Sequence, residues 1–344
     1  MMLGDMGADV IKVERPELGD ETRGWGPPFD ERGESAYFLS TNRNKKGIAA
    51  DLASEPGRAL IASLCSRADV VIENFRRGAL ARLGLDPARL CAENPRLVWL
   101  TVTGFGPESD RPGYDFVVQA ERGWMSISGE SGGPPMKSGV ALVDVITGKD
   151  AVAAVLAALL ARTRTGKGAQ IQVSLARSAT SALMNVAQNA LVSGRDAARW
   201  GNAHPNLVPY QLFDAADRPI VVAVGSDAQW QAAAAVLGVD DLRADPRLAT
   251  NAGRLAHREL VVRAVADRLR RRAAAEWIAE FDAAGVPCGV VRGVEDALRE
   301  EGDASPTTGV GPSVPGSVRL PPPRLDEHGD DIRRLGWDAF RRPP

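Results

Sequence analysis

The order of apolar and polar positions predicts alternating strands and helices over the first two hundred residues. Short runs rich in β-branched residues alternate with longer segments in which apolar residues recur every three or four positions. The expected strands are 8–14, 69–75, 97–105, 139–145 and 170–176. The expected helices are 55–68, two short ones within 78–95, 149–163 and one over 178–194. Such alternation is typical of a parallel sheet covered by helices on both faces, so we predict a Rossmann-like α/β domain.

The pattern changes near residue 195, where a loop-rich stretch precedes a strand at 218–225 and several amphipathic helices. This indicates a second, smaller α+β domain. A Pro/Gly-rich connector follows, with one short expected strand at 316–320 and a final helix at 330–340 that should return to the first domain. We therefore expect a large domain at 1–195, a small one at 200–305, and a connector with a C-terminal helix at 306–344.

The start of the chain differs from that of an ordinary α/β domain. Residues 1–7 resemble the tail of a helix that ends at Gly7, directly ahead of the strand at 8–14. Because such domains normally begin with a strand, we expect the first βα unit to be missing upstream of this sequence.

The composition of the chain argues against several kinds of binding partner and against a metal site. Forty-two basic residues against 44 acidic ones give a formal charge of −2, so no general attraction to nucleic acid or to an anionic membrane is expected. No apolar run reaches the ~20 residues that span a bilayer, and the first residues lack the basic charge of a signal peptide. The three cysteines and three histidines are scattered, which argues against disulfides and a metal site. These features predict a soluble cytoplasmic protein.

One candidate ligand-binding segment follows the strand at 69–75. Asn74 and the backbone of Phe75 lie there beside Arg76, Arg77 and Arg82. In open α/β sheets, ligands bind beyond the carboxyl ends of the strands, and guanidinium groups suit phosphates. A solvated basic helix start is the alternative. Because no GxGxxG or P-loop spacing occurs, a dinucleotide or ATP site is not indicated.

Three other loops hold possible binding residues. The segment 11–29 carries Arg15 and Arg23 beside acids, and these form either a binding loop or internal salt bridges. Asp115, next to Tyr114, is expected to be the N-cap of the helix that follows. The loop 201–213 contains a lone histidine, His204, which more often has a structural than a catalytic role.

Asp144 lies between an apolar run and the long Ala/Leu helix, and it is either a helix cap or a working carboxylate. Thr147 and Asp150 have the spacing of a capping box, so Asp144 is not required as the cap. We therefore expect Asp144 at the end of a buried strand, beside a helix N-terminus that lowers its pKa. Such a carboxylate is a poor general base but a usable nucleophile, with an internal ion pair as the alternative.

Taken together, these segments resemble the family III CoA-transferases. This family includes formyl-CoA transferase, carnitine CoA-transferases, succinyl-CoA:dicarboxylate transferases and α-methylacyl-CoA racemases, and the succinyl-CoA:dicarboxylate branch is nearest. The resemblance extends over nearly the whole chain. It is carried by GADVIKVERPELGDETRGWGPPF, NRNKKGIAADL, ADVVIENFRRGALARLG, NPRLVWLTVTGFG, RPGYDFVVQA, DVITG with its helix, RTGKGAQIQVSL and GNAHPNLVPYQLF.

The resemblance implies an interlocked homodimer whose substrates are an acyl-CoA and a small carboxylic acid, with no permanently bound cofactor and no metal. It places the nucleophile on Asp144. The residues that it assigns to coenzyme A are Arg15, Asn74, Phe75, Ala79 and Arg82. The residues that it assigns to enclosing the substrate are Tyr37, Tyr114, Gly201, Asn202 and His204.

Two alternatives stay open from the sequence. An acyl-CoA racemase of the same family is disfavoured because those enzymes carry histidine where this chain has Tyr114. A catalytically inactive CoA-binding protein is the other alternative, and the expected absence of the first βα unit motivates it.

Overall fold

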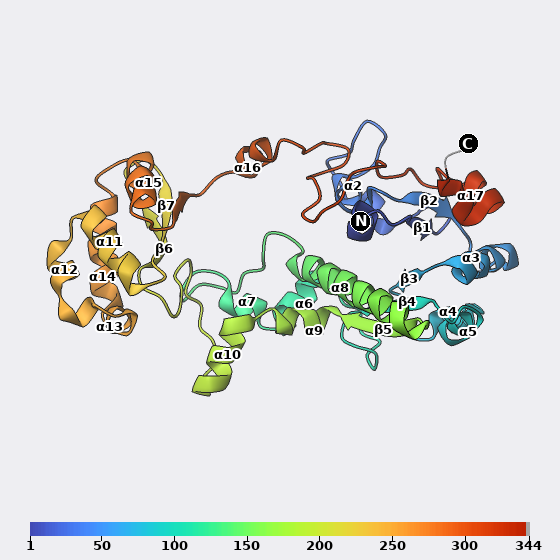
Figure 1. Ribbon diagram of the computed structural model, residues 1–344, viewed down its shortest axis with the longest axis horizontal. Helices are drawn as coiled ribbons and strands as arrows, with labels where there is room; N and C mark the ends of the chain where they lie inside the picture. Colours follow the sequence, from blue (N-terminus) through green and yellow to red (C-terminus); the bar gives the residue numbers. More distant parts are fainter. Residues whose placement is uncertain (342–344) are drawn as a thin grey trace. The chain divides into compact units, whose positions relative to one another are not determined.

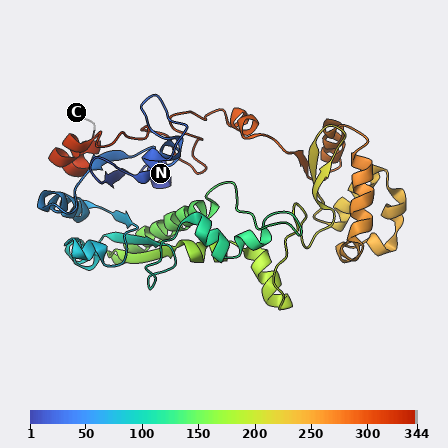
Figure 2. The ribbon, with the colours of Figure 1, turned by 180° about the vertical axis from the view of Figure 1, so that it is seen from behind.

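The computed structural model describes residues 1–341 and divides the chain into two compact units. Unit 1 comprises residues 1–123, 139–185 and 298–344, and unit 2 comprises residues 124–138 and 186–297. Figure 1 shows the elements with their labels, and Figure 2 shows them from behind. Within the described residues, no helix is both long and apolar enough to cross a membrane.

Unit 1 contains two parallel sheets. Its strands are β1 (Ile11–Glu14), β2 (Lys46–Ala49), β3 (Val70–Glu73), β4 (Val98–Thr103) and β5 (Ala169–Ser174). One sheet has the order β1–β2 and the other β3–β4–β5. Ile11 lies opposite Lys46 in the first, and Val98 lies between Val70 and Ala169 in the second. The parallel α/β character expected from the sequence is therefore confirmed, as two sheets within this unit.

Helices cover both faces of the β3–β4–β5 sheet. The helices of unit 1 are α1 (Met2–Asp5), η1 (Glu21–Gly24), α2 (Ala36–Asn42), α3 (Glu55–Arg67), α4 (Ala79–Arg82), α5 (Pro87–Glu93), α6 (Asp115–Glu121), α8 (Leu142–Thr165), α9 (Leu175–Ser181), α17 (Gly329–Leu335) and η3 (Gly336–Phe340). Leu100 of β4 packs with Val155 of α8 on one face, whereas Trp99 packs with Leu90 of α5 on the other. In both views α8 runs along this sheet (Figure 1, Figure 2).

The C-terminal helix returns to unit 1, as the sequence predicts. Ile332 of α17 is fully buried against Ile48 of β2 and Leu64 of α3. The expected strand at 316–320 is wrong, because these residues belong to no strand in the described part of the chain. A side chain holds part of this segment instead: Asn44 Oδ1 accepts hydrogen bonds from the backbone N–H groups of Arg319 and Leu320.

The expected strand at 139–145 is also wrong, because α8 already begins at Leu142. The buried residues at the start of α8 are spaced four apart: Val143, Thr147, Ala151 and Val155. This spacing puts them on one face of a helix, whereas a strand would bury alternate residues. The expected single helix at 178–194 is two helices, α9 and α10 (Met184–Ser193).

Unit 2 has an antiparallel sheet packed against helices, in agreement with the α+β character expected there. Its strands are β6 (Tyr210–Asp214), β7 (Pro219–Ala223) and β8 (Cys288–Val290), in the order β6–β7–β8. Its helices are α7 (Trp124–Ile127), α11 (Asp227–Leu237), α12 (Asp240–Ala244), η2 (Pro246–Leu248), α13 (Asn251–Ala256), α14 (Arg258–Leu269) and α15 (Ala274–Ala283). The core includes Trp230, Val265 and Phe281. The helices α10 and α16 (Val294–Glu301) span points where the chain passes between the units.

Candidate active site

Asp144 lies in the first turn of α8, and its side chain is exposed. The cap of this helix comes from a different element. The Asp115 Oδ1 atom, on α6, accepts hydrogen bonds from the backbone N–H groups of Val143 (2.7 Å) and Asp144 (3.2 Å). The other Asp115 oxygen accepts a hydrogen bond of 2.5 Å from Gln119 Nε2. Asp115 therefore caps α8 rather than the helix that it begins, which corrects the expectation from the sequence.

The segment that carries Asp115 is fixed by a close approach of two glycines. Gly113 lies against Gly104, just after β4, and a Cβ on either residue would overlap the backbone of the other. This contact holds Tyr114 and Asp115 near the carboxyl end of the central strand. Tyr114 is exposed and directly precedes α6.

The pKa of Asp144 is raised to about 6, first by desolvation and second by the negative charge of Asp115. The carboxylate is exposed at the surface, yet enough protein surrounds it to weaken its hydration. The expected lowering of its pKa is therefore wrong. The helix N-terminus does not stabilise the charge of Asp144 as expected, because its backbone N–H groups already bind a carboxylate of the same sign.

The expected capping box of Thr147 and Asp150 is absent from α8. Thr147 is buried inside the helix, and its Oγ1 donates a hydrogen bond of 2.7 Å to Val143 O. Asp150 accepts a hydrogen bond of 2.6 Å from the hydroxyl of Ser178 on α9. Asp144 is nevertheless free of the capping role, because Asp115 performs it.

Tyr37 of α2 lies in the electrostatic field of both carboxylates. Its pKa is raised by desolvation and then by the charges of Asp144 and Asp115. The ring packs edge-to-face against Trp25, with the ring centroids 4.9 Å apart and an angle of 71° between the planes. Both rings are exposed. Sequence reasoning missed Trp25 as the packing partner of Tyr37, although Trp25 lies in one of the segments that carry the resemblance.

The residues assigned to coenzyme A between 74 and 82 follow the end of β3, as expected. The backbone N–H of Phe75 donates a hydrogen bond of 2.7 Å to Glu73, whose carboxylate also accepts from Thr101 Oγ1. Gly78 adopts φ +70° just before α4, a conformation that favours glycine. The side chains of Asn74, Phe75 and Arg82 are exposed on this turn and Ala79 is half-buried, so the turn is open to a ligand.

Arg15 lies in the turn after β1. Its Nε donates a hydrogen bond of 3.0 Å to Gly19 O, and the guanidinium is 3.9 Å from Glu21. Within residues 1–341, no hydrogen bond or ion pair joins Arg15 to the turn after β3. The two parts of the expected CoA site are thus separate segments of unit 1.

The loop residues Gly201, Asn202 and His204 belong to unit 2. His204 Nδ1 accepts a hydrogen bond of 3.0 Å from the backbone N–H of Asn206, so the proton of a neutral ring lies on Nε2. Burial and the nearby charge of Arg258 lower its pKa. Arg258 also donates to the carbonyl oxygens of His204 and Pro205. These contacts give His204 a structural role in the loop.

The chemistry available in unit 1 is that of a basic carboxylate. With a pKa near 6, Asp144 is ionised at neutral pH and is more basic than an ordinary aspartate. It is accessible, which suits attack on an electrophilic carbon or removal of a proton. Among the residues that the structure describes, no group of three or more His, Cys, Asp or Glu side chains is placed to hold a metal ion.

Comparison with known proteins shows the class of protein to which this parallel α/β chain belongs. Residues 1–305 match the sequence profile of CoA-transferase family III. The chain therefore belongs to this family and is a CoA-transferase.

Characterised relatives place the chain near one branch of the family. It is 43% identical over 307 residues to succinate–glutarate CoA-transferase from Agrobacterium fabrum, covering 87% of this chain and 77% of that protein. It is 39% identical over 303 residues to succinyl-CoA:glutarate CoA-transferase from Mus musculus, covering 87% and 69%. The expected resemblance to the succinyl-CoA:dicarboxylate branch is thus confirmed.

The fold has a counterpart among solved structures. The crystal structure of a CAIB/BAIF family protein from Brucella suis superimposes with a TM-score of 0.83 at 41% identity. The match covers 97% of this chain and 93% of that one. The α/β architecture is therefore that of a CAIB/BAIF family protein.

Proposed function

We propose that this enzyme moves CoA from succinyl-CoA to a dicarboxylic acid such as glutarate, with Asp144 as the covalent nucleophile. The names of the relatives from Agrobacterium fabrum and mouse suggest the donor and the acceptor. One observation carries the assignment of the nucleophile: Asp144 is an exposed carboxylate whose pKa is raised to about 6, and its charge in turn raises the pKa of Tyr37.

In the first half of the reaction, a carboxylate oxygen of Asp144 attacks the thioester carbon of the acyl-CoA. The carbon–sulfur bond breaks, CoA leaves as a thiolate, and the acyl group and Asp144 form a mixed anhydride. The thiolate then attacks the Asp144 carbonyl carbon of this anhydride. The donor acid leaves as a carboxylate, and CoA is held as a thioester of Asp144.

In the second half, the carboxylate of the acceptor acid attacks the Asp144 thioester and expels the CoA thiolate. A second mixed anhydride results. The thiolate attacks the acceptor carbonyl carbon of this anhydride, which releases the new acyl-CoA and restores the Asp144 carboxylate. The complete cycle converts one acyl-CoA and one carboxylate into another acyl-CoA and another carboxylate, and Asp144 returns to its starting state.

The neighbours of Asp144 have distinct roles in this proposal. Asp115 holds the first turn of α8 in place and raises the basicity of the nucleophile through its charge. The N–H groups of Val143 and Asp144 are already bound to Asp115, so they do not serve as oxyanion donors. The hydroxyl of Tyr37 keeps its proton at neutral pH because its pKa is raised, so it is a candidate donor to a developing oxyanion.

We assign the coenzyme A moiety to the turn after β3 and to Arg15. Asn74, Phe75, Ala79 and Arg82 offer an accessible surface with a guanidinium group, which suits a phosphate. Arg15 would bind from the turn after β1. The role of Gly201, Asn202 and His204 in enclosing the acyl group stays a prediction, as do the domain limits at 195, 200 and 305.

The assembly that we propose is the interlocked homodimer. The exposed apolar side chains of Leu191 and Val192 on α10 support a contact surface there. Light scattering of the purified protein tests this proposal, and a monomeric mass under assay conditions would refute it.

The nucleophile is tested by replacing Asp144 and following transfer from succinyl-CoA to a panel of acids by mass spectrometry. We expect Asp144→Ala to abolish transfer while the protein stays folded by circular dichroism. Asp150→Asn is the matched control, because Asp150 lies on the same helix and is bonded only to Ser178 among the described residues. We expect near-normal transfer in this control. Transfer at the wild-type rate in Asp144→Ala would refute the mechanism.

The same assay separates the alternative functions. Exchange of an α-deuteron of the acyl group without transfer to any acid would indicate a racemase. Binding of acyl-CoA without any turnover would indicate an inactive CoA-binding protein.

A further inference from the structure

We propose that Arg23 is a positioning residue of this enzyme, which fixes α2 and with it the exposed ring of Tyr37, the candidate donor to the oxyanion. The inference rests on the proposed function, because it assigns Arg23 a role in that site. Arg23 does not touch the reacting carboxylate itself, and its contacts run through the loop between β1 and α2.

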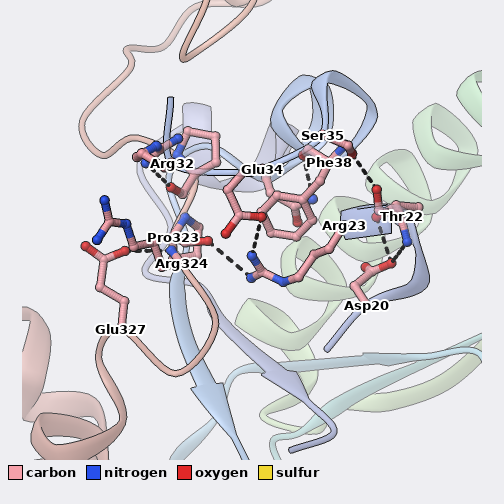
Figure 3. Close-up of polar contacts among 12 residues, drawn as sticks. Asp20, Thr22, Arg23, Arg32, Glu34, Ser35, Phe38, Pro323, Arg324 and Glu327 are labelled. Carbon is pink, nitrogen blue, oxygen red and sulfur yellow. Dashed lines mark hydrogen bonds and ion pairs between the residues drawn. The ribbon is translucent and has the colours of Figure 1, made fainter. Parts of the chain in front are cut away.

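Arg23 is held by two buried carboxylates. Its Nε and Nη2 atoms each donate a hydrogen bond of 2.8 Å to Glu14, one to each oxygen. Its Nη1 atom is 2.7 Å from Glu34 (Figure 3). The side chains of Arg23, Glu14 and Glu34 are only 10%, 2% and 11% exposed. A bidentate pair that is shielded from water fixes the direction of the guanidinium group.

The guanidinium group lies over a ring of the helix that carries Tyr37. Its central carbon is 3.8 Å from the centroid of the Phe38 ring, and Phe38 is fully buried (Figure 3). Because Phe38 directly follows Tyr37 in α2, a fixed Phe38 limits the rotation and sliding of this turn. Cation–π contact of this kind adds to the packing.

A second link joins the loop around Arg23 to the start of α2. Ser35 is the N-cap of α2, and its Oγ accepts a hydrogen bond of 3.0 Å from Phe38 N. The same hydroxyl donates a hydrogen bond of 2.5 Å to Thr22 O (Figure 3). Two residues beyond Arg23, Trp25 packs on Tyr37. The residues 22–25 therefore contact α2 at its cap, at Phe38 and at Tyr37.

The C-terminal segment completes the contacts of Arg23. Its Nη2 atom also donates a hydrogen bond of 3.1 Å to Pro323 O (Figure 3). Pro323 lies beyond residue 305, where the match to the family profile ends. The segment after the family match thus helps to hold the loop that packs against α2.

The test compares Arg23→Lys with Arg32→Lys. Lysine keeps the charge but loses the planar fork, so it cannot bind both oxygens of Glu14 in the bidentate manner of Arg23 and lie over the Phe38 ring at once. Arg32 is a matched control in the same loop, because it pairs with Asp30 and donates to Pro322 O. We expect kcat for CoA transfer to fall about tenfold or more in Arg23→Lys, with KM for succinyl-CoA little changed. We expect Arg32→Lys to stay near the wild-type kcat.

A double-mutant cycle with Tyr37→Ala distinguishes positioning from general destabilisation. If Arg23 acts through Tyr37, adding Arg23→Lys to Tyr37→Ala lowers kcat little further, because the positioned ring is already gone. Losses that multiply in the double variant, or an unchanged kcat in Arg23→Lys, would overturn the inference. Thermal unfolding confirms that each variant is folded at the assay temperature.

If Arg23→Lys does not fold, Phe38→Leu replaces it in the cycle, because it removes the ring under the guanidinium and keeps the ion pairs. Losses of kcat that multiply in the double variant, or an unchanged kcat in Phe38→Leu, would then overturn the inference. A separate result would refute the proposed function: transfer of CoA at the wild-type rate by Asp144→Ala. An inactive Asp144→Ala together with multiplying losses in the cycle overturns only the role of Arg23.

Discussion

At the scale of single residues, the decisive pair is Asp144 and Asp115. One carboxylate occupies the N–H groups at the start of α8, and this leaves the other exposed, poorly hydrated and close to a like charge. The same arrangement anchors the proposed nucleophile, Asp144, and raises its basicity. A carboxylate that must attack a thioester gains from both effects.

Replacing Asp115 by Asn tests how its charge affects the nucleophile. Asn keeps an oxygen that accepts from Val143 N but removes the negative charge, so the pKa of Asp144 should fall. In the proposed mechanism transfer requires ionised Asp144, so we expect activity to be lost as the pH drops through its pKa of about 6. We therefore expect the acidic limb of the pH profile of kcat to move to lower pH. The shift should be partial, because desolvation is the larger cause of the raised pKa.

For this variant the transfer rate is measured from about pH 4.5 to about pH 8, so that the range includes the pKa of Asp144, which is about 6, and the ordinary pKa of a carboxylic acid is approached at its lower end. Glu108→Gln is a suitable control, because Glu108 is an exposed acid of unit 1 whose partner is Arg77. An acidic limb that stays in place or moves to higher pH in Asp115→Asn would contradict the electrostatic role of Asp115.

The sequence was informative about the identity of these residues and misleading about their surroundings. Asp144 was selected from its place before a helix and from the family resemblance. Its raised pKa does not follow from the sequence, because it depends first on desolvation in the folded chain and second on Asp115, which is distant in the sequence and caps α8 in the fold. The spacing of residues along the sequence does not predict tertiary contacts of this kind.

At the scale of elements, the spacing of buried residues decides where α8 begins. Val143, Thr147, Ala151 and Val155 form one stripe, so the apolar run at 139–145 is mostly a helix start. The strands β1, β3, β4 and β5 were predicted correctly from short β-branched runs. The wrong strands at 139–145 and 316–320 show that an apolar run alone does not specify pairing.

In unit 2, a buried arginine ties α13 to the loop that precedes β6. Arg254 is 1% exposed and donates hydrogen bonds to Val208 O (2.8 Å), Leu248 O (3.0 Å) and Asp227 (2.9 Å). Arg254→Met leaves buried carbonyl groups without these donors. We expect the free energy of unfolding to fall by about 2–4 kcal/mol in this variant.

Denaturant unfolding measures this effect, with Arg263→Met on α14 as the control. Arg263 is exposed, so its replacement should change stability by less than about 0.5 kcal/mol. Equal stability of the two variants would show that the contacts of Arg254 do not hold unit 2 together.

At the scale of the whole molecule, each unit is built from segments that are far apart in the sequence. Residues 298–344 belong to unit 1 and reach both its core, through Ile332, and the loop of Arg23, through Pro323. Local periodicity identified the C-terminal helix but not these contacts, because they depend on the path of an irregular segment. Membership of CoA-transferase family III was recognised from the motifs together, since no single motif was specific.

The central claim is that Asp144 carries CoA during the reaction, and trapping this intermediate tests it most directly. The wild-type enzyme is incubated with succinyl-CoA without an acceptor acid and treated with hydroxylamine, which cleaves thioesters. Peptide mass spectrometry then locates the modified residue. We predict a hydroxamate on Asp144, dependent on succinyl-CoA and absent from Asp144→Ala. A modification at another residue, or an unmodified Asp144 in an enzyme that transfers CoA, would contradict the account.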